Sequence, residues 1–244
     1  MKKTMQPTLY LIPVPLSDAP AEQVLPAAVK DIINRINHFI VEDIRTARRH
    51  LRKMGFTGSI DSLTFYLLNE HTRPEEYRAL MSPLKEGHSV GLMSDAGIPV
   101  VADPGNGYIL LVQQAGFRVV PLTGPSSIFL ALMASGLNGQ NFTFHGYLPV
   151  QQGARIKKIK ELEKISAACG QSQLFMEAPY RNAALLRDIL NNCKPETYLC
   201  IAADITSENE FICTRTVAVW KEKMPDIQKH PAIFILSGYR QAVT

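Results

Sequence analysis

The segment SDAGIPVVADPG, residues 94–105, combines small side chains with two Asp-containing turns and follows directly on an apolar run at residues 90–94. Small side chains let a ligand approach backbone N–H and C=O groups closely. Asp95 and Asp103 are equally suited to capping their own backbone in tight turns. The segment therefore indicates either a ligand-binding loop or a plain pair of turns at the end of a strand.

The apolar run before this segment is one of several strand-like runs in the first half of the chain, and helical patterns separate them. The predicted strands are residues 9–13, 39–42, 63–67, 90–94 and 117–121, and the predicted helices are residues 22–36, 45–54, 74–85 and 107–115. Parallel neighbours need a crossover connection, so this alternation predicts a mainly parallel sheet with helices on its faces. Ligands bind such sheets beyond the carboxyl ends of the strands, where we expect residues 94–97.

The second half of the chain follows without a Ser- or Gly-rich linker. A loop at residues 123–126 leads into an apolar helical run at residues 128–134. Further on, the predicted helices are residues 155–169 and 181–193, and the predicted strands are residues 174–177, 198–203, 217–220 and 232–236. We therefore expect two closely packed α/β lobes, residues 1–121 and residues 122–244.

Composition narrows the class of protein only a little. The chain has 26 Lys and Arg against 22 Asp and Glu, a net charge of +4. This mild bias is compatible with an anionic partner but is far from that of a nucleic-acid-binding tail. The 4 cysteines show no CxxC pair and no metal-ligand spacing, which favours reduced thiols in a cytosolic protein. No stretch approaches the ~20 apolar residues of a membrane span, so we expect a cytoplasmic protein.

Several familiar catalytic and nucleotide-binding motifs are missing. No GxGxxG follows the first predicted strand, and no GxxxxGK[ST] or Ser nucleophile elbow occurs. The histidines are scattered without HExxH spacing, so we predict no metal site. These absences argue against dinucleotide, P-loop and serine-hydrolase chemistry.

Short polar segments after the predicted strands form an ordered series along most of the chain. The series is YLIP at 10–13, EDIRT at 42–46, NE at 69–70, SDAGIPVVADPG at 94–105, PLTGPS at 121–126, SGL at 135–137 and FHGYLP at 144–149. It resembles the motifs of the tetrapyrrole methylase superfamily. The closest branch is the bacterial methyltransferases that modify a cytidine ribose 2′-OH in small-subunit ribosomal RNA. No single match is decisive, but their order and spacing are hard to obtain by chance.

The resemblance implies two α/β lobes, with a mainly parallel sheet in the first and a mixed sheet in the second. It also implies S-adenosylmethionine in the cleft between the lobes, a homodimer, and ribosomal RNA or the small ribosomal subunit as partner. Methyl transfer is an in-line displacement that needs no metal. The cofactor-binding residues that it implies are Pro13, Ser94, Asp95, Ala96, Gly97, Ile98, Val101, Ser126 and Ser127, joined by Met176, Glu177, Ala203 and Ala232 from the second lobe.

Asp43 is the first candidate for a catalytic base, and Glu42 is the second. A ribose hydroxyl is a poor nucleophile near neutral pH, so a carboxylate that takes its proton would assist the reaction. The same two carboxylates are equally suited to capping the helix predicted to begin near Ile44. The sequence leaves both roles open.

Four arginines lie at roughly one-turn spacing on one side of that helix: Arg45, Arg48, Arg49 and Arg52. They are candidates for binding RNA phosphates, which would give salt-dependent affinity without sequence preference. Arginines also commonly solvate a surface helix, so this interpretation stays open too.

Several positions depart from the family pattern. Pro15 and Leu16 occupy the region of a Gly-Asn pair, Ile98 replaces a threonine, Ala47 replaces a histidine, and apolar residues at 66–68 replace further histidines. The chain also ends soon after its last predicted strand, without the usual C-terminal extension of the family. We expect a short, divergent member. Two alternatives stay open: a methyltransferase for a small molecule such as a tetrapyrrole, and a non-catalytic cofactor-binding paralogue.

Overall fold

The strands predicted in the first half form one parallel sheet. In the computed structural model, which describes residues 6–239, they are β1 (Thr8–Ile12), β2 (His38–Val41), β3 (Thr64–Leu67), β4 (Val90–Met93) and β5 (Arg118–Pro121). Their order across the sheet is β3-β2-β4-β1-β5, and all neighbouring strands are parallel. This sheet belongs to the first of two compact units, Met1–Ser126 and Ser127–Thr244.

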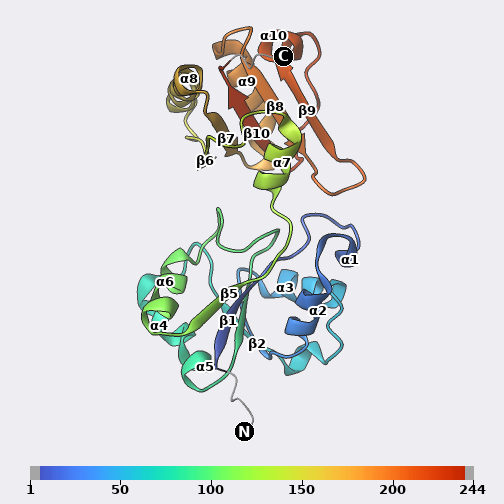
Figure 1. Cartoon of the computed structure of the whole chain (residues 1–244), viewed down its shortest axis with the longest axis vertical. Helices are drawn as coiled ribbons and strands as arrows, with labels where there is room; N and C mark the ends of the chain where they lie inside the picture. The colour runs from blue at the N-terminus through green and yellow to red at the C-terminus, as the bar shows by residue number, and fades with distance from the viewer. Residues whose placement is uncertain (1–5, 240–244) are drawn as a thin grey trace. The chain divides into compact units, whose positions relative to one another are not determined.

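Helices cover both faces of this sheet (Figure 1) because its central strands bury apolar side chains on both sides. On one face, α2 (Ala27–Ile33) and α3 (Ile44–Lys53) pack in the cluster that contains Phe39. On the other face, α6 (Asn106–Gln114) packs in the cluster that contains Ile40. The shorter helices are α1 (Ala21–Val24), α4 (Tyr77–Leu80), α5 (Ser82–Lys85), η1 (Ile60–Ser62) and η2 (Pro74–Glu76).

Two helices predicted as continuous are interrupted in the structure. Residues 22–36 form α1 and α2 with a break between them, because Pro26 lacks an N–H and its ring cannot pass through a helix interior. Residues 74–85 form η2, α4 and α5 in succession, and Pro83 lies in the first turn of α5, where proline is tolerated.

The second unit contains a mixed sheet, as predicted. Its strands are β6 (Phe142–Tyr147), β7 (Ser172–Met176), β8 (Tyr198–Ala203), β9 (Phe211–Thr216) and β10 (Ala232–Ser237), in the order β6-β7-β10-β8-β9. β6 and β7 are parallel, and the other neighbouring pairs are antiparallel. β6 and β9 were not among the predicted strands.

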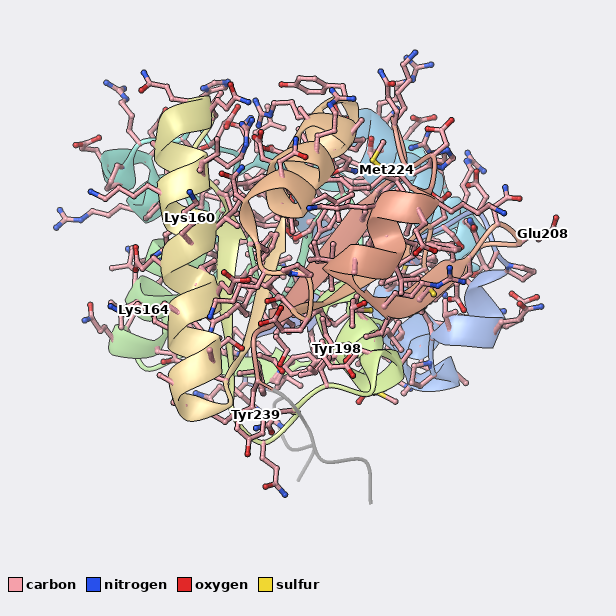
Figure 2. The ribbon with its side chains drawn as sticks, turned by 90° about the horizontal axis from the view of Figure 1, so that it is seen from above. Lys160, Lys164, Tyr198, Glu208, Met224 and Tyr239 are labelled. Carbon is pink, nitrogen blue, oxygen red and sulfur yellow. The ribbon has the colours of Figure 1, made fainter. Side chains whose placement is uncertain are left out.

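The helices of the second unit pack in two places. One contacts the strands of the sheet, and two others contribute to the main hydrophobic core. α7 (Ser127–Ser135) contacts β8, β9 and β10. α8 (Gln152–Cys169) and α9 (Asn182–Asn192) pack in the core that contains the stacked Phe175 and Phe234 rings. Lys160 and Lys164 are exposed on α8 (Figure 2), whereas Ile159 and Leu162 of the same helix are buried in the core. Within residues 6–239, no helix is long and apolar enough to cross a membrane.

The strand predicted at residues 217–220 is wrong, because these residues begin the helix α10 (Val217–Glu222). β-branched residues favour strands, which misled the prediction. In the structure the Thr216 side chain caps this helix by accepting from the Val219 N–H. Val217 and Trp220 then lie one turn apart and are both buried in the core. Burial of this pair outweighs the local strand preference.

Candidate functional site

Residues 94–105 form the loop between β4 and α6, beyond the carboxyl end of a strand in the first sheet. Its backbone has a positive φ at Gly97 (72°), Val100 (74°), Ala102 (70°) and Gly105 (124°). A β-branched residue such as valine is a genuine outlier there, and such strain costs of order 1–3 kcal/mol. Strain of this kind persists only where the surroundings enforce it, and it is concentrated at ligand-binding sites. This favours the binding-loop interpretation of the segment.

Hydrogen bonds from three other segments hold the loop. The Val14 N–H, after β1, donates to the Gly97 carbonyl at 2.9 Å. On α3, the buried His50 side chain donates from Nε2 to the Asp95 carbonyl at 2.9 Å. Glu42 follows β2 directly, and its Oε1 accepts a hydrogen bond from the Asp95 N–H at 3.3 Å. The segments at residues 42–50 and 94–97, far apart in the sequence, therefore meet at one edge of the sheet.

Glu42 is the carboxyl group most altered by this environment. Its pKa is raised from 4.5 to about 7 by burial first and by the charges of Asp103 and Asp95 second, and hydrogen bonds from the Asp95 N–H and Ser94 oppose this shift. Partial burial also raises the pKa values of Asp95 and Asp103. Carboxyl groups this close cannot all be ionised without repulsion. A carboxyl group with a pKa near 7 is well matched to accepting a proton at neutral pH.

Asp43 has a different environment although it is the next residue. Its Oδ1 accepts the Thr46 N–H at 2.7 Å, so it is the N-cap of α3. This hydrogen bond is the main cause that lowers the pKa of the exposed Asp43 carboxyl group. A lowered pKa makes a weaker base. The catalytic role of either residue stays a prediction, but the order of preference is reversed in favour of Glu42.

The four predicted RNA-binding arginines are all exposed on α3: Arg45, Arg48, Arg49 and Arg52. The last three border a shallow depression of about 330 Å³ together with Ile60 and Asp61. Arg48 Nη2 lies 3.4 Å from Asp61 Oδ1, and the guanidinium of Arg48 lies over the Phe65 ring. Exposed ion pairs contribute little to stability. The Arg48 guanidinium can therefore exchange this carboxylate for a phosphate at small cost.

The end of β1 is packed tightly against the PLTGPS segment. A Cβ atom on Gly124 would lie 2.2 Å from Pro13 Cβ, far inside van der Waals contact. A Cβ atom on Gly97 would also meet the Pro125 carbonyl oxygen at 3.3 Å. Pro13, Gly97 and Pro125 are buried. The glycines of these two motifs thus permit close approach between three segments of the site.

Replacing Gly124 by Ala is therefore expected to destabilise the protein by about 1–3 kcal/mol, the usual cost of forcing an extra methyl group into a packed region. Urea unfolding measures this as a lower midpoint. Gly153→Ala is the matched control, because a Cβ atom there has no neighbour within 4 Å and alanine suits the helix α8. Equal midpoints for both variants would contradict the packing that we describe.

The remaining predicted cofactor residues of the first unit present both apolar and small side chains. Ala96 is exposed, Ile98 is half-buried, and Val101 keeps 44% of its surface exposed. Ser126, the last residue of the first unit, is buried immediately before α7, whereas Ser127 begins that helix and belongs to the second unit. An apolar surface beside small residues suits a flat nucleoside ring, and the start of a helix suits a carboxylate.

The predicted residues of the second unit gather at one edge of its sheet. Ala232, the first residue of β10, pairs with Ala203 at the end of β8, and the next residue pairs with Met176 at the end of β7. Glu177 follows Met176 and is buried. Its Oε1 accepts from Arg181 Nη2 at 2.6 Å and from the Ala178 N–H at 2.7 Å. Contact of these residues with a cofactor stays a prediction.

Sequence reasoning missed two members of the first site. His50 was grouped with the scattered histidines, and Asp103 was considered only as a turn residue. His50 follows Ala47 by three residues and precedes Leu51, and all three side chains are buried on α3. This inward-facing helical pattern is the signal that could have found it. Nothing local in the sequence indicates that Asp103 lies near enough to Glu42 for its charge to raise the Glu42 pKa.

The comparisons with known proteins bear on this site. No protein-family model matches the chain. Ribosomal RNA small subunit methyltransferase I of Vibrio cholerae is 32% identical over 239 residues, which are 97% of this chain and 79% of that protein. The chain belongs to the ribosomal RNA small subunit methyltransferase I family. The relative of the same name in Mesorhizobium japonicum is 33% identical and matches 88% of this chain and 69% of its own length.

Solved structures agree with the predicted fold. Cobalt precorrin-4 methyltransferase, a cobalamin biosynthetic enzyme, superposes with a TM-score of 0.62 over 97% of each chain, at 14% identity. At this identity the likeness concerns the fold alone. The predicted fold is confirmed by these structures, and the predicted ribosomal RNA methyltransferase branch is confirmed by the relatives. This member of the family is an enzyme, a methyltransferase that uses a methyl-donor cofactor.

Proposed function

We propose that this methyltransferase transfers a methyl group from S-adenosylmethionine to a ribose 2′-hydroxyl of small-subunit ribosomal RNA. Two features support the acceptor: the names of the relatives and the arginines of α3. The observation that carries the proposal is Glu42, a half-buried carboxyl group with a pKa of about 7 that lies just before this helix.

Glu42 is assigned the role of general base. Bound S-adenosylmethionine supplies an electrophilic methyl group on a positively charged sulfur. Glu42 would accept the hydrogen of the ribose hydroxyl and take up the proton that the oxygen loses when it is methylated. Holding the hydroxyl in line with the methyl group supplies much of the acceleration, and the base supplies a further part.

The residues of the first unit fit such a donor. Ile98 and Val101 would provide apolar surface for an adenine ring, and the small, exposed Ala96 leaves its backbone accessible. The clustered carboxyl groups of Glu42 and its acidic neighbours favour a cationic ligand, because a positive charge relieves their repulsion. The same positive charge would increase the ionised fraction of Glu42 when the donor is bound.

The helix α3, which carries the four arginines, places positive charge next to Glu42. Glu42 is separated from the first helical residue, Ile44, by Asp43 alone. Arg48, Arg49 and Arg52 then border the depression on α3. These arginines would offset the negative charge of the acidic loop, and phosphates bound to them would position the RNA strand.

The rate of transfer is expected to rise with pH through about 7. Glu42 accepts a proton only when ionised, and its pKa in the folded protein is raised, so the active form is lost as the pH falls below about 7. The pH profile of kcat/KM measures this ionisation in the free enzyme. The acidic limb should disappear in Glu42→Gln. A flat profile between about pH 6 and 8 would contradict the assignment.

Titration calorimetry with S-adenosylhomocysteine tests the donor separately from the acceptor. We expect binding in the micromolar range or tighter, and absence of binding below millimolar concentration would overturn the choice of donor. A homodimer stays a prediction from the family resemblance, and a cytoplasmic location stays a prediction from the sequence composition.

A further inference from the structure

Two large aromatic side chains are exposed at the edge of the second sheet that carries Met176. Tyr147 is the last residue of β6 and keeps 58% of its surface exposed. Tyr180 lies in the 3-10 turn η3 (Pro179–Arg181) after β7, and 65% of its surface is exposed. Because Tyr147 pairs with Met176, and η3 begins soon after Met176, both rings belong to the same edge.

The strand β6 is built irregularly at this point. The register between β6 and β7 shifts between Phe144 and Tyr147, and Gly146 has a φ of 64°. An irregularity of this kind redirects the side chains that follow it, and such features are common beside binding sites. The orientation of Tyr147 at the sheet edge therefore depends on a local feature that regular pairing would not provide.

Arg181 holds Tyr180 in a fixed arrangement. The Arg181 guanidinium lies over the Tyr180 ring, 5.1 Å from its centre, and Nη1 donates to the Tyr180 hydroxyl at 3.1 Å. Nη2 donates to Glu177, whose side chain has no exposed surface. The hydrogen bond with Glu177 raises the pKa of Arg181, and the charges of Glu177, Tyr180 and Tyr147 act in the same direction. The Tyr180 ring is thus hydrogen-bonded to, and covered on one side by, a guanidinium that is itself anchored to Glu177.

We propose that Tyr180, with Arg181 against one side of its ring and Tyr147 nearby, stacks an unpaired base of the RNA acceptor. Sequence-specific RNA recognition targets unpaired bases, which stack on aromatic rings and on arginine planes. The positive charge of Arg181 suits the phosphate that accompanies each base. This inference rests on the proposed function, since it assigns to the RNA substrate a second contact apart from the α3 arginines.

Another exposed tyrosine of the same unit provides the matched control. Tyr239, labelled in Figure 2, keeps 48% of its surface exposed and follows the end of β10. The end of β10 lies beside the start of β7, because Leu236 pairs with Gln173. Tyr239 thus lies at the sheet edge opposite to Tyr180 and has a similar exposure. Loss of its ring should leave RNA binding unchanged.

The test measures binding of a fluorescent single-stranded RNA to the full chain, without methyl transfer. Tyr180→Ala should weaken binding about 5- to 150-fold, which corresponds to the ~1–3 kcal/mol of one base–aromatic stack. Tyr180→Phe, which keeps the ring, should bind within about twofold of the wild type. Binding of the same RNA in a duplex, and of S-adenosylhomocysteine, should not change.

Three results would overturn the proposal. The first is that Tyr180→Ala binds single-stranded RNA as the wild type does, the second that it loses affinity for the duplex equally, and the third that it loses affinity for S-adenosylhomocysteine instead. Methyl transfer is then measured separately. If label enters RNA and the KM for RNA is the same in Tyr180→Ala as in the wild type, only the stacking proposal is overturned. Tyr180-dependent binding without any transfer would overturn only the proposed function.

Discussion

Replacing Glu42 by Gln is expected to lower methyl transfer about 100- to 10,000-fold, the range that general-base catalysis contributes. Glutamine keeps the size and can still accept the Asp95 N–H, but it cannot take up the hydroxyl proton. Single-turnover rates with saturating donor measure the loss. The affinity for S-adenosylhomocysteine should stay within a few-fold, because the loop backbone is unchanged.

Asp43→Asn separates the two candidate bases. Asparagine caps a helix as well as aspartate does, so α3 keeps its N-cap while the charge is removed. If Glu42 is the base, this variant should retain most of the transfer rate. A large loss in Asp43→Asn together with an active Glu42→Gln would show that Asp43 is the base.

Replacing Asp188 by Ala is expected to destabilise the protein by about 3–5 kcal/mol, the cost of leaving one partner of a buried ion pair uncompensated. Arg155 Nε and Nη2 both donate to Asp188 Oδ2, at 2.8 and 2.5 Å, and Gln152 donates to Oδ1 at 2.9 Å. Both charged side chains are only 7% exposed. The pair joins α8 to α9, and its loss leaves the Arg155 charge buried.

Urea unfolding provides the measurement, with Glu161→Ala as the control. Glu161 also forms an ion pair from α8, with Lys158 at 2.8 Å, but that pair is exposed to solvent. Its removal should leave the unfolding midpoint unchanged within error. Similar shifts for both variants would contradict the stabilising role that we give to burial of the Arg155–Asp188 pair.

The regular parts of the fold could be predicted because their signals are local. Buried strands such as 90–93 are short apolar runs, and turn residues mark their ends. The predictions of secondary structure failed where tertiary contacts decide between helix and strand. Val217 and Val219 favour a strand by themselves, yet burial of Trp220 makes them helical. The strand β9 just before them has a half-exposed, mixed pattern that carries little signal.

The candidate site was only partly predictable for the same reason. The SDAGIPVVADPG motif located the loop, and the family resemblance identified the chemistry. The choice between Glu42 and Asp43 depends on burial and on the nearness of Asp103, which lies 61 positions after Glu42 in the printed sequence. The local sequence draws attention to Asp43, because Thr46 follows it at the spacing of a helix cap. That spacing reflects the role of Asp43 as the N-cap of α3 and not a catalytic role.

The most direct test of the central claim supplies labelled S-adenosylmethionine and this enzyme to small ribosomal subunits from cells that lack its gene. The RNA is then digested to nucleosides. The account predicts label in a 2′-O-methylated nucleoside, 2′-O-methylcytidine by the family resemblance, and its loss in Glu42→Gln. Label on a base, label only in an added tetrapyrrole, or no transfer despite binding of S-adenosylhomocysteine would contradict it.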